Sequence, residues 1–201
     1  MSKFQKPLSK FIENYKVELS KSIMNLDNKK LETIIKLIKE AVINNRKIFT
    51  CGNGGSASIS NHFLCDFNKG VKYFSKKKIL PKIISLSNSI ENITAIANDE
   101  NFSQIFESQL ENFAERNDLL IALSCSGNSK NILNALKFAK SKKCKTILIT
   151  GFKKDVKYVD VHLNVDIKNY GISEDVFQSI MHISSQFLKA EFNKRGSKEY
   201  L

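Results

Sequence analysis

The sequence has no hydrophobic run that approaches the roughly 18 apolar residues of a membrane-spanning helix. No apolar core follows its first lysines either, so we expect a chain that is neither anchored in a membrane nor exported. The four cysteines, Cys51, Cys65, Cys125 and Cys144, show no CxxC spacing, and the first two flank a glycine loop in positions that we expect to be buried. Reduced thiols in a cytoplasmic protein fit this usage.

Acidic residues are fewer than basic ones, 20 against 32, which gives a net charge of +12. This charge favours anionic partners such as phosphosugars, nucleic acid or acidic membrane surfaces and does not choose among them. No helix-turn-helix pattern or basic-and-aromatic RNA motif is present, which argues against a nucleic-acid partner. At 201 residues the chain is long enough for one well-buried α/β core and short for two.

The segment 47–66, KIFTCGNGGSASISNHFLCD, predicts a strand, a glycine loop and a helix. Its glycines allow a tight turn with positive φ, and Ser56 is a candidate cap for the helix. Because helix N-termini attract anions, we expect a phosphate site here. A dinucleotide site is disfavoured, since no third glycine follows at the GxGxxG interval and no acidic residue closes a second strand about twenty residues further on. His62 and Asp66 follow at i and i+4 on one helix face, a pair able to hold a metal or share a proton.

The same order of strand, polar loop and helix recurs after the very apolar segment DLLIAL at 118–123. The loop SCSGNS at 124–129 combines hydroxyl groups with a flexible glycine just before a predicted helix. These donors suit an anion at a helix N-terminus, where the macrodipole adds about 0.3 to 1 kcal/mol. We therefore predict a second phosphate contact in this loop.

Apolar periodicity predicts the other elements. Two helices at 8–26 and 28–45 precede the first strand, with Asp27 or Asn28 as the cap of the second, and we expect them to pack on the core or, preferentially, on another subunit. Further strands are expected at 82–86, 145–150 and 161–165, and helices at 56–69 with Gly70 as its end, 90–97, 102–113, 130–143 and from a Ser173 cap to a stop at Gly196.

This alternation predicts an α/β three-layer sandwich with a five-stranded parallel sheet of flavodoxin-like type, covered by helices on both faces. Ligands of such sheets bind at the carboxyl ends of the strands, where both polar loops are expected. We divide the chain into an N-terminal helical pair for oligomerisation, 1–46, and a phosphosugar-binding domain, 47–201.

The chain resembles the sugar isomerase (SIS) domain family and, within it, the phosphoheptose isomerases. The resemblance covers nearly the whole chain and rests on GNGGSAS at 52–58, HFLCD at 62–66, TAIANDE at 94–100, SCSGNS at 124–129 and ISEDVFQSIMH at 172–182. It implies a homotetramer with active sites at subunit interfaces. It further implies that the sugar phosphate is held by Asn53, Gly54, Gly55, Ser56, Asp66, Asn98, Asp99, Ser124, Cys125, Ser126, Ser129 and Glu174.

The family's metal and acid/base set would fall on His62, Asp66, Glu174 and His182. Two of these positions depart from the family, which usually has Glu in place of Asp66 and Gln in place of Glu174. The shorter carboxylate draws its oxygens back by roughly 1 to 1.5 Å. The extra carboxylate favours Zn²⁺ if a metal binds, and otherwise tends to raise the pKa of a neighbouring carboxyl group. Glu174 and His182 lie about 12 Å apart if one helix carries both, which leaves Gln178 as a local alternative partner of His182. Metal dependence stays open.

The implied reaction is the conversion of sedoheptulose 7-phosphate to D-glycero-D-manno-heptose 7-phosphate through an enediol, for surface polysaccharide. We assign Asp66 as the base and His182 as the acid/base group, with Glu174 as the next candidate base. A zinc ion at His62 could polarise the carbonyl or order the site. The alternatives are an isomerase of another sugar phosphate, a non-catalytic phosphosugar-binding regulator, and a partner of a replication initiator. His162, on a strand, is interpreted as structural.

Overall fold

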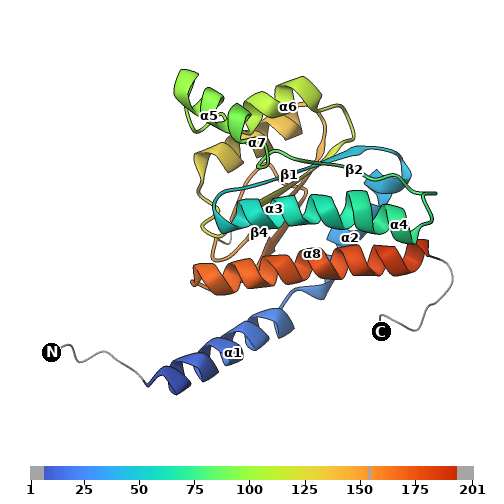
Figure 1. Cartoon of the computed structure of the whole chain (residues 1–201). Coiled ribbons are helices and arrows are strands. Elements are labelled where there is room, and N and C mark those ends of the chain that lie inside the picture. Colours follow the sequence, from blue (N-terminus) through green and yellow to red (C-terminus); the bar gives the residue numbers. More distant parts are fainter. Residues whose placement is uncertain (1–6, 154, 194–201) are drawn as a thin grey trace.

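The computed structural model describes residues 7–153 and 155–193. Its five strands form one sheet in the order β2-β1-β3-β4-β5, and every pair is parallel. The predicted fold class is thereby confirmed (Figure 1). The strands are β1 (Lys47–Gly52), β2 (Lys82–Ser85), β3 (Leu119–Ser124), β4 (Lys145–Thr150) and β5 (Val161–Asn164).

The helices cover both faces of this sheet and follow the predicted order along the chain. The first two precede the sheet, and the longest one ends the described chain. They are α1 (Leu8–Met24), α2 (Asn28–Ile43), α3 (Gly55–Cys65), the π-helix η1 (Asp66–Val71), α4 (Lys72–Phe74), α5 (Ile90–Asp99), α6 (Glu107–Phe113), α7 (Lys130–Ser141) and α8 (Tyr170–Phe192). None of the helices within residues 7–153 and 155–193 has both the length and the hydropathy to span a bilayer.

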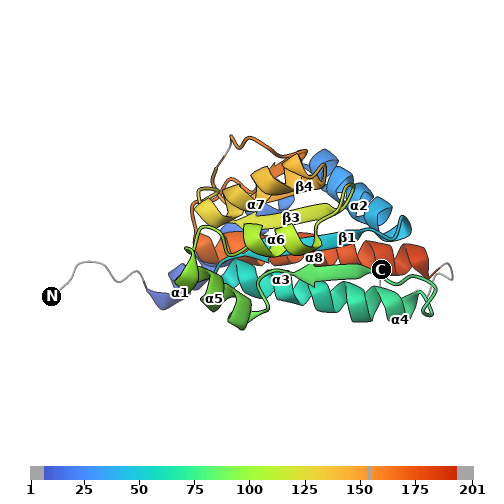
Figure 2. The same ribbon diagram turned by 90° about the horizontal axis from the view of Figure 1, so that it is seen from above.

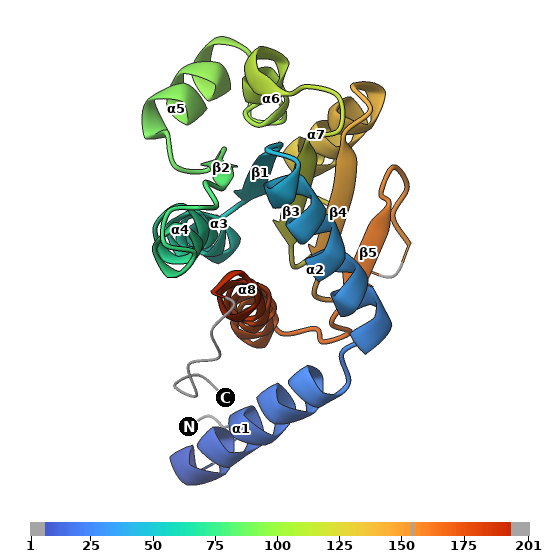
Figure 3. The same cartoon turned by 90° about the vertical axis from the view of Figure 1, so that its right-hand side faces the viewer.

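Two hydrophobic cores lie on the opposite faces of the sheet because successive strand residues point in opposite directions. Ile48 packs into the core shared with α2, α3 and α8, whereas its neighbour Phe49 packs into the core shared with α6 and α7. Figure 3 shows these two layers on either side of the strands. The α3/α8 layer therefore rests on a rigid sheet, which fixes how these two helices face each other.

The two leading helices are used differently. α2 buries Ile34 and Ile38 completely in the core, and the Asp27 side chain caps it by accepting the Lys30 N–H. The buried stripe of α2 thus packs on the core of its own chain, whereas our preferred expectation was a contact with another subunit. α1 contacts α8, where Tyr15 donates a hydrogen bond of 2.6 Å to Asp175, and in Figure 2 it projects beyond the body of the sheet. Several of its apolar side chains stay exposed, among them Leu8, Phe11 and Met24.

Two predicted caps are replaced by other residues. Gly54 and not Ser56 precedes α3, and the helix begins at Gly55. The Asn169 side chain caps α8 by accepting the Ile172 N–H at 3.2 Å, so the helix begins at Tyr170 and Ser173 lies inside it. The Ser173 hydroxyl instead donates to the carbonyl of residue 167. An early start of α8 places Glu174 on the same helix as His182.

Three further expectations were wrong. Residues 102–106 are not helical, because the Asn101 side chain accepts hydrogen bonds from the N–H and hydroxyl of Ser103 and so competes with helix formation. Gly70 does not end its helix, which continues through η1 and α4 to residue 74. Cys65 is exposed, whereas Cys51 is buried as expected. The predicted stop at Gly196 lies outside the described residues.

Candidate active site

The glycines of the loop after β1 are required by a positive φ at one position and by close contacts at two others. Gly54 has a φ of +54°, a conformation that glycine adopts without strain. A Cβ on Gly52 would lie 2.6 Å from the backbone of Ser56, and a Cβ on Gly55 would lie 2.2 Å from the Glu174 carboxylate. The chain therefore turns sharply into α3. The Glu174 side chain, from the distant helix α8, packs against Gly55, the first residue of α3.

The loop after β3 offers hydroxyl groups at the start of α7. Ser129 is the N-cap residue of α7 without a side-chain capping bond, and its hydroxyl lies 3.4 Å from that of Ser124. Ser124 accepts the N–H of Gly127, whose φ is +62°, and Ser126 accepts the N–H of residue 128. These contacts hold the loop in a curve around the first turn of α7, where the helix dipole favours an anion.

Both loops line one cavity of about 270 Å³ at the carboxyl edge of the sheet. Asn53 ties them together, since its side-chain amide exchanges two hydrogen bonds, of 3.0 and 2.9 Å, with that of Asn131 on α7. Sequence reasoning missed Asn131 and the lining residue Tyr170, for which the sequence offers no local signal. The lining consists of Asn53, Gly54, Gly55, Ser56, Leu123, Ser124, Cys125, Ser126, Ser129, Tyr170 and Glu174.

The carboxylate of Glu174 stands at the N-terminus of α3, where the Ser56 N–H hydrogen-bonds to it. Burial raises the pKa of Glu174, the charge of Asp175 adds to this rise, and the Ser56 N–H opposes it. Burial, followed by the nearby charge of Glu174, raises the pKa of the Cys125 thiol to about 11. The cavity thus contains a carboxylate on its α3 side, hydroxyl groups on its α7 side and a protonated thiol between them.

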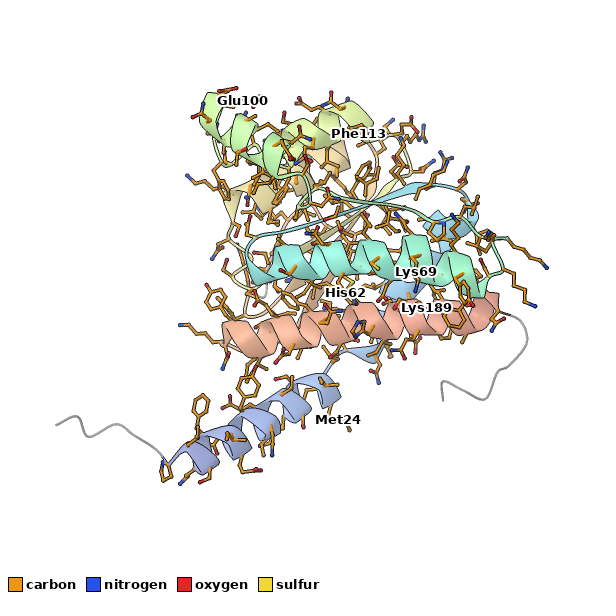
Figure 4. The ribbon with its side chains drawn as sticks, in the orientation of Figure 1. Met24, His62, Lys69, Glu100, Phe113 and Lys189 are labelled. Atoms are coloured by element: carbon orange, nitrogen blue, oxygen red, sulfur yellow. The ribbon has the colours of Figure 1, made fainter. Side chains whose placement is uncertain are left out.

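A second group of polar side chains lies farther along α3 and α8. The Nε2 atoms of His62 and His182 are 3.0 Å apart, and they lie 3.7 and 3.8 Å from Oδ2 of Asp66. Gln178 contacts Nε2 of His182 at 2.8 Å, as the local alternative anticipated. Figure 4 shows His62 at the seam between α3 and α8. The i, i+4 pair of α3 and the histidine of α8 therefore meet within one chain.

Asp66 has two further partners that sequence reasoning missed. Ser185 donates to its Oδ2 at 3.0 Å, and the Lys189 ammonium lies 3.2 Å from its Oδ1. A signal for both was present in the sequence, because the polar residues of α8 that face α3 recur at helical spacing. This row consists of Glu174, Gln178, His182, Ser185 and Lys189.

Glu174 lies apart from the His62, Asp66 and His182 group, and Asn98 and Asp99 lie apart from both that group and the cavity. Glu174 lines the cavity, about 12 Å along the axis of α8 from His182. Asn98 and Asp99 are exposed at the end of α5, where they hydrogen-bond to each other, and neither lines the cavity. Figure 4 shows the adjacent Glu100 far from the seam. His162 lies on β5 and contacts the Thr150 hydroxyl at 2.8 Å.

The chemistry of the three-residue group suits a metal ion. The possible ligand atoms of His62, Asp66 and His182 all lie within 4.8 Å of one another. Two imidazoles and one carboxylate are a donor set of catalytic zinc sites, which keep a further position for water or substrate. Glu174 does not belong to this group, so the predicted set of four is reduced to three within one chain.

The chain matches known proteins over most of its length. The sequence profile of the SIS domain matches residues 10–151. The chain is 32% identical over 182 residues to a probable phosphoheptose isomerase from Thermoplasma acidophilum, an alignment covering 90% of this chain and 98% of that protein. It is 42% identical over 121 residues to a phosphoheptose isomerase from Aliarcobacter butzleri, with 60% of this chain and 62% of that protein covered.

Solved structures of phosphoheptose isomerases have the same fold as this chain. The structure of a phosphoheptose isomerase from Francisella tularensis matches with a TM-score of 0.81 at 24% identity, covering 90% of this chain and 96% of that one. The phosphoheptose isomerase structure from Neisseria gonorrhoeae matches with a TM-score of 0.80 at 22% identity, covering 92% and 100%. The chain therefore belongs to the SIS domain family, and the relatives reported above are named as phosphoheptose isomerases, which are enzymes.

Proposed function

We propose that this protein is an aldose–ketose isomerase that converts sedoheptulose 7-phosphate to D-glycero-D-manno-heptose 7-phosphate through an enediol. The observation that carries the proposal is the pairing of two sites on the same two helices. A hydroxyl-lined cavity lies at the N-terminal ends of α3 and α8, and the His62, Asp66 and His182 group lies two turns farther along.

The phosphate end of the substrate is assigned to the α7 side of the cavity. Ser124, Ser126 and Ser129 offer hydroxyl donors there, and the first turn of α7 adds backbone N–H groups and its dipole. The α3 side holds the Glu174 carboxylate, which repels a phosphate and accepts hydrogen bonds from sugar hydroxyls. This polarity orients the ligand with its phosphate at α7 and its chain directed along the seam.

The two sites are close enough for one sugar phosphate to reach both. His62 lies seven residues beyond Gly55, which is about 10 Å along α3 at 1.5 Å per residue. An extended chain advances about 1.2 Å per bond, so phosphorus and C2 of a seven-carbon 2-ketose phosphate, seven bonds apart, span about 8 Å. A heptulose 7-phosphate with its phosphate in the cavity can therefore bring C2 towards the seam, and the turnover assay below decides between it and shorter ketose phosphates.

The side chains at the α3/α8 seam have different roles in the proposed proton transfers. Oδ2 of Asp66 faces both imidazoles and is the base that takes the proton beside the carbonyl. His182, oriented by its 2.8 Å contact with Gln178, moves a proton at the substrate oxygens. Glu174 binds substrate from the cavity. A Zn²⁺ held by His62, Asp66 and His182 would supply Lewis-acid polarisation of the carbonyl.

We further propose a cytoplasmic homotetramer in which sites are completed across subunits and whose product supplies heptose for surface polysaccharide. Residues 1–46 would serve its assembly. The exposed apolar side chains of α1 support a contact between copies, since such residues mark interaction surfaces when they gather on one helix. Asn98 and Asp99 are exposed on α5, and an interface would bring them to the cavity of a neighbour.

The test is turnover of sedoheptulose 7-phosphate by the purified protein, followed as aldose formation beside an Asp66→Ala variant. We expect turnover by the wild type and its near-complete loss in the variant. Equal rates from both proteins, or no turnover by either of them across several ketose phosphates, would rule out the proposed isomerase activity. Binding of sugar phosphates without any turnover would favour the regulator. The proposed zinc site is tested by comparing the metal content of the wild type with that of His62→Ala, both purified without chelator.

A further inference from the structure

We propose that Lys189 is a positioning residue for the Asp66 carboxylate, and that Gly70 belongs to the same arrangement by leaving room for it. The inference rests on the proposed isomerase because it gives Asp66 the role of the base. It adds Lys189, which contacts the Asp66 carboxylate on the side away from His62 and His182. In Figure 4 Lys189 lies farther along the α3/α8 seam than His62.

The two oxygens of Asp66 have different surroundings. Oδ1 is 3.2 Å from the Lys189 ammonium. Oδ2 accepts the Ser185 hydroxyl at 3.0 Å and is the oxygen nearest to His62 and His182. Lys189 therefore holds one oxygen and leaves the other directed at the imidazoles. A rotation of the carboxylate that moved Oδ2 away would also break the contact with Lys189.

The Lys189–Asp66 pair is shielded from solvent. The two side chains keep 20% and 17% of their exposed surface, whereas freely solvated ion pairs on this chain, such as Lys16 with Glu13, keep 65% and 67%. Exposed pairs orient little because water and salt screen them. Partial burial restricts the ammonium to the position beside Oδ1.

Gly70 makes this position available. A Cβ on Gly70 would lie 2.6 Å from Cε and 2.9 Å from Nζ of Lys189. Gly70 lies in η1, the six-residue π-helix that begins at Asp66. Such π-turns are uncommon and gather at functional sites. The glycine that was expected to end a helix instead lies within it and admits the lysine side chain.

The positioning matters because Asp66 is short. An aspartate carboxylate has less reach than a glutamate carboxylate, so its direction must be held from outside. A displacement of about 1 Å of a reacting group can lower a rate by about 10²-fold. Removal of the ammonium should therefore act on the chemical step and leave the phosphate cavity unchanged.

The experiment compares Lys189→Met with Lys39→Met. Lys39 is a matched control, because it also bridges to α8 through an ion pair, with Glu191, away from the seam. We expect Lys189→Met to lower kcat by about 10- to 100-fold with KM changed less than about twofold, and Lys39→Met to leave kcat within about twofold. Gly70→Ala, which displaces the ammonium without removing it, should reproduce the fall in kcat. Lys189→Arg should recover part of it.

Crystal structures of Lys189→Met and Gly70→Ala give a readout that does not depend on turnover. We expect Oδ2 of Asp66 to move away from the two imidazoles in both. An unmoved carboxylate, or a kcat equal to that of the wild type, would overturn the positioning role. If the wild type itself turns over no ketose phosphate, the proposed function fails, and the position of Asp66 in these structures still decides the role of Lys189.

Discussion

The chain contains two units of the same local design, β1–α3 and β3–α7, and they differ in what fills the start of the helix. Both place a polar loop at the carboxyl edge of the sheet, and both loops line the same cavity. The N-terminus of α3 receives the Glu174 carboxylate from α8, whereas that of α7 keeps its hydroxyl groups free of a capping bond. The protein therefore places a carboxylate of its own at the start of α3 and none at the start of α7, where we propose that the phosphate binds.

The two helices differ in the same way beyond their first turns. α3 continues to His62 and Asp66, which meet α8 at the seam. α7 instead buries Ile132, Ala135 and Leu136 in the core on the other face of the sheet. Under the proposed function, two copies of one local arrangement have different tasks, chemistry in the first and phosphate binding in the second.

The largest effect is expected from Asp66→Asn, which keeps the size of the side chain and removes the basic carboxylate. We expect kcat to fall by about 10²- to 10⁴-fold, with KM changed little, because a positioned acid or base contributes that much. Steady-state kinetics with sedoheptulose 7-phosphate measures it. Asp175→Asn is the matched control, since that carboxylate bonds Tyr15 outside the cavity. A similar fall in both variants would contradict the assignment of chemistry to the α3 unit.

Gly55→Ala tests the contact that distinguishes the α3 unit. The added methyl group would overlap the Glu174 carboxylate, so we expect a loss of about 1 to 3 kcal/mol in the free energy of unfolding, as for other overpacked sites. Urea denaturation measures this loss. Adding Gly55→Ala to a Glu174→Ala chain should cost much less, because the overlap is gone. Equal costs in the two backgrounds would show that Glu174 does not stand at Gly55.

Ser129→Ala tests the α7 unit. Its hydroxyl makes no capping bond, so its removal should spare the fold and raise KM roughly tenfold, the size of a lost hydrogen bond to a charged group. Kinetics beside thermal unfolding separates the two effects. Ser141→Ala, at the other end of the same helix, is the control. A KM equal to that of the wild type would place the phosphate elsewhere.

Glu174→Gln should have the smallest effect and the opposite sign. Loss of the carboxylate should tighten inorganic phosphate binding at pH 7.5 roughly threefold to fivefold, the size of a solvent-screened charge pair. Calorimetric titration measures this, with Asp175→Asn as the control. Equal affinities in Glu174→Gln and the wild type would show that the Glu174 carboxylate at the start of α3 does not affect phosphate binding in the cavity.

Glu174→Gln should also change how the free energy of unfolding depends on pH. Burial raises the pKa of Glu174 in the folded state, so its protonated form is favoured by folding. The stability linked to this group is present below the unfolded pKa and is lost as pH rises through the folded pKa. Glu174→Gln should therefore gain stability over the wild type as pH rises through that range. Urea denaturation at several pH values checks the direction.

The sequence by itself determined the elements and the class of the fold. The strand at 145–150 was predicted with the bounds that β4 has, and the two strand–loop–helix segments were recognised from glycine, serine and apolar spacing. The pairing of His62 with Asp66 followed from helical periodicity. All of these depend on interactions between residues close in the chain, which propensity, caps and periodicity report directly.

Only the tertiary structure decided which helix start is filled and what surrounds Asp66. Glu174 reaches Gly55, and Lys189 reaches Asp66 and Gly70, across more than a hundred residues of sequence. These contacts depend on how α8 lies against α3, which is set by the packing of both helices on the sheet. The spacing of the polar residues along α8 shows that they share a face, and does not show which residues of α3 they meet. For the same reason Asn98 and Asp99, grouped with the cavity by resemblance, lie away from it within one chain.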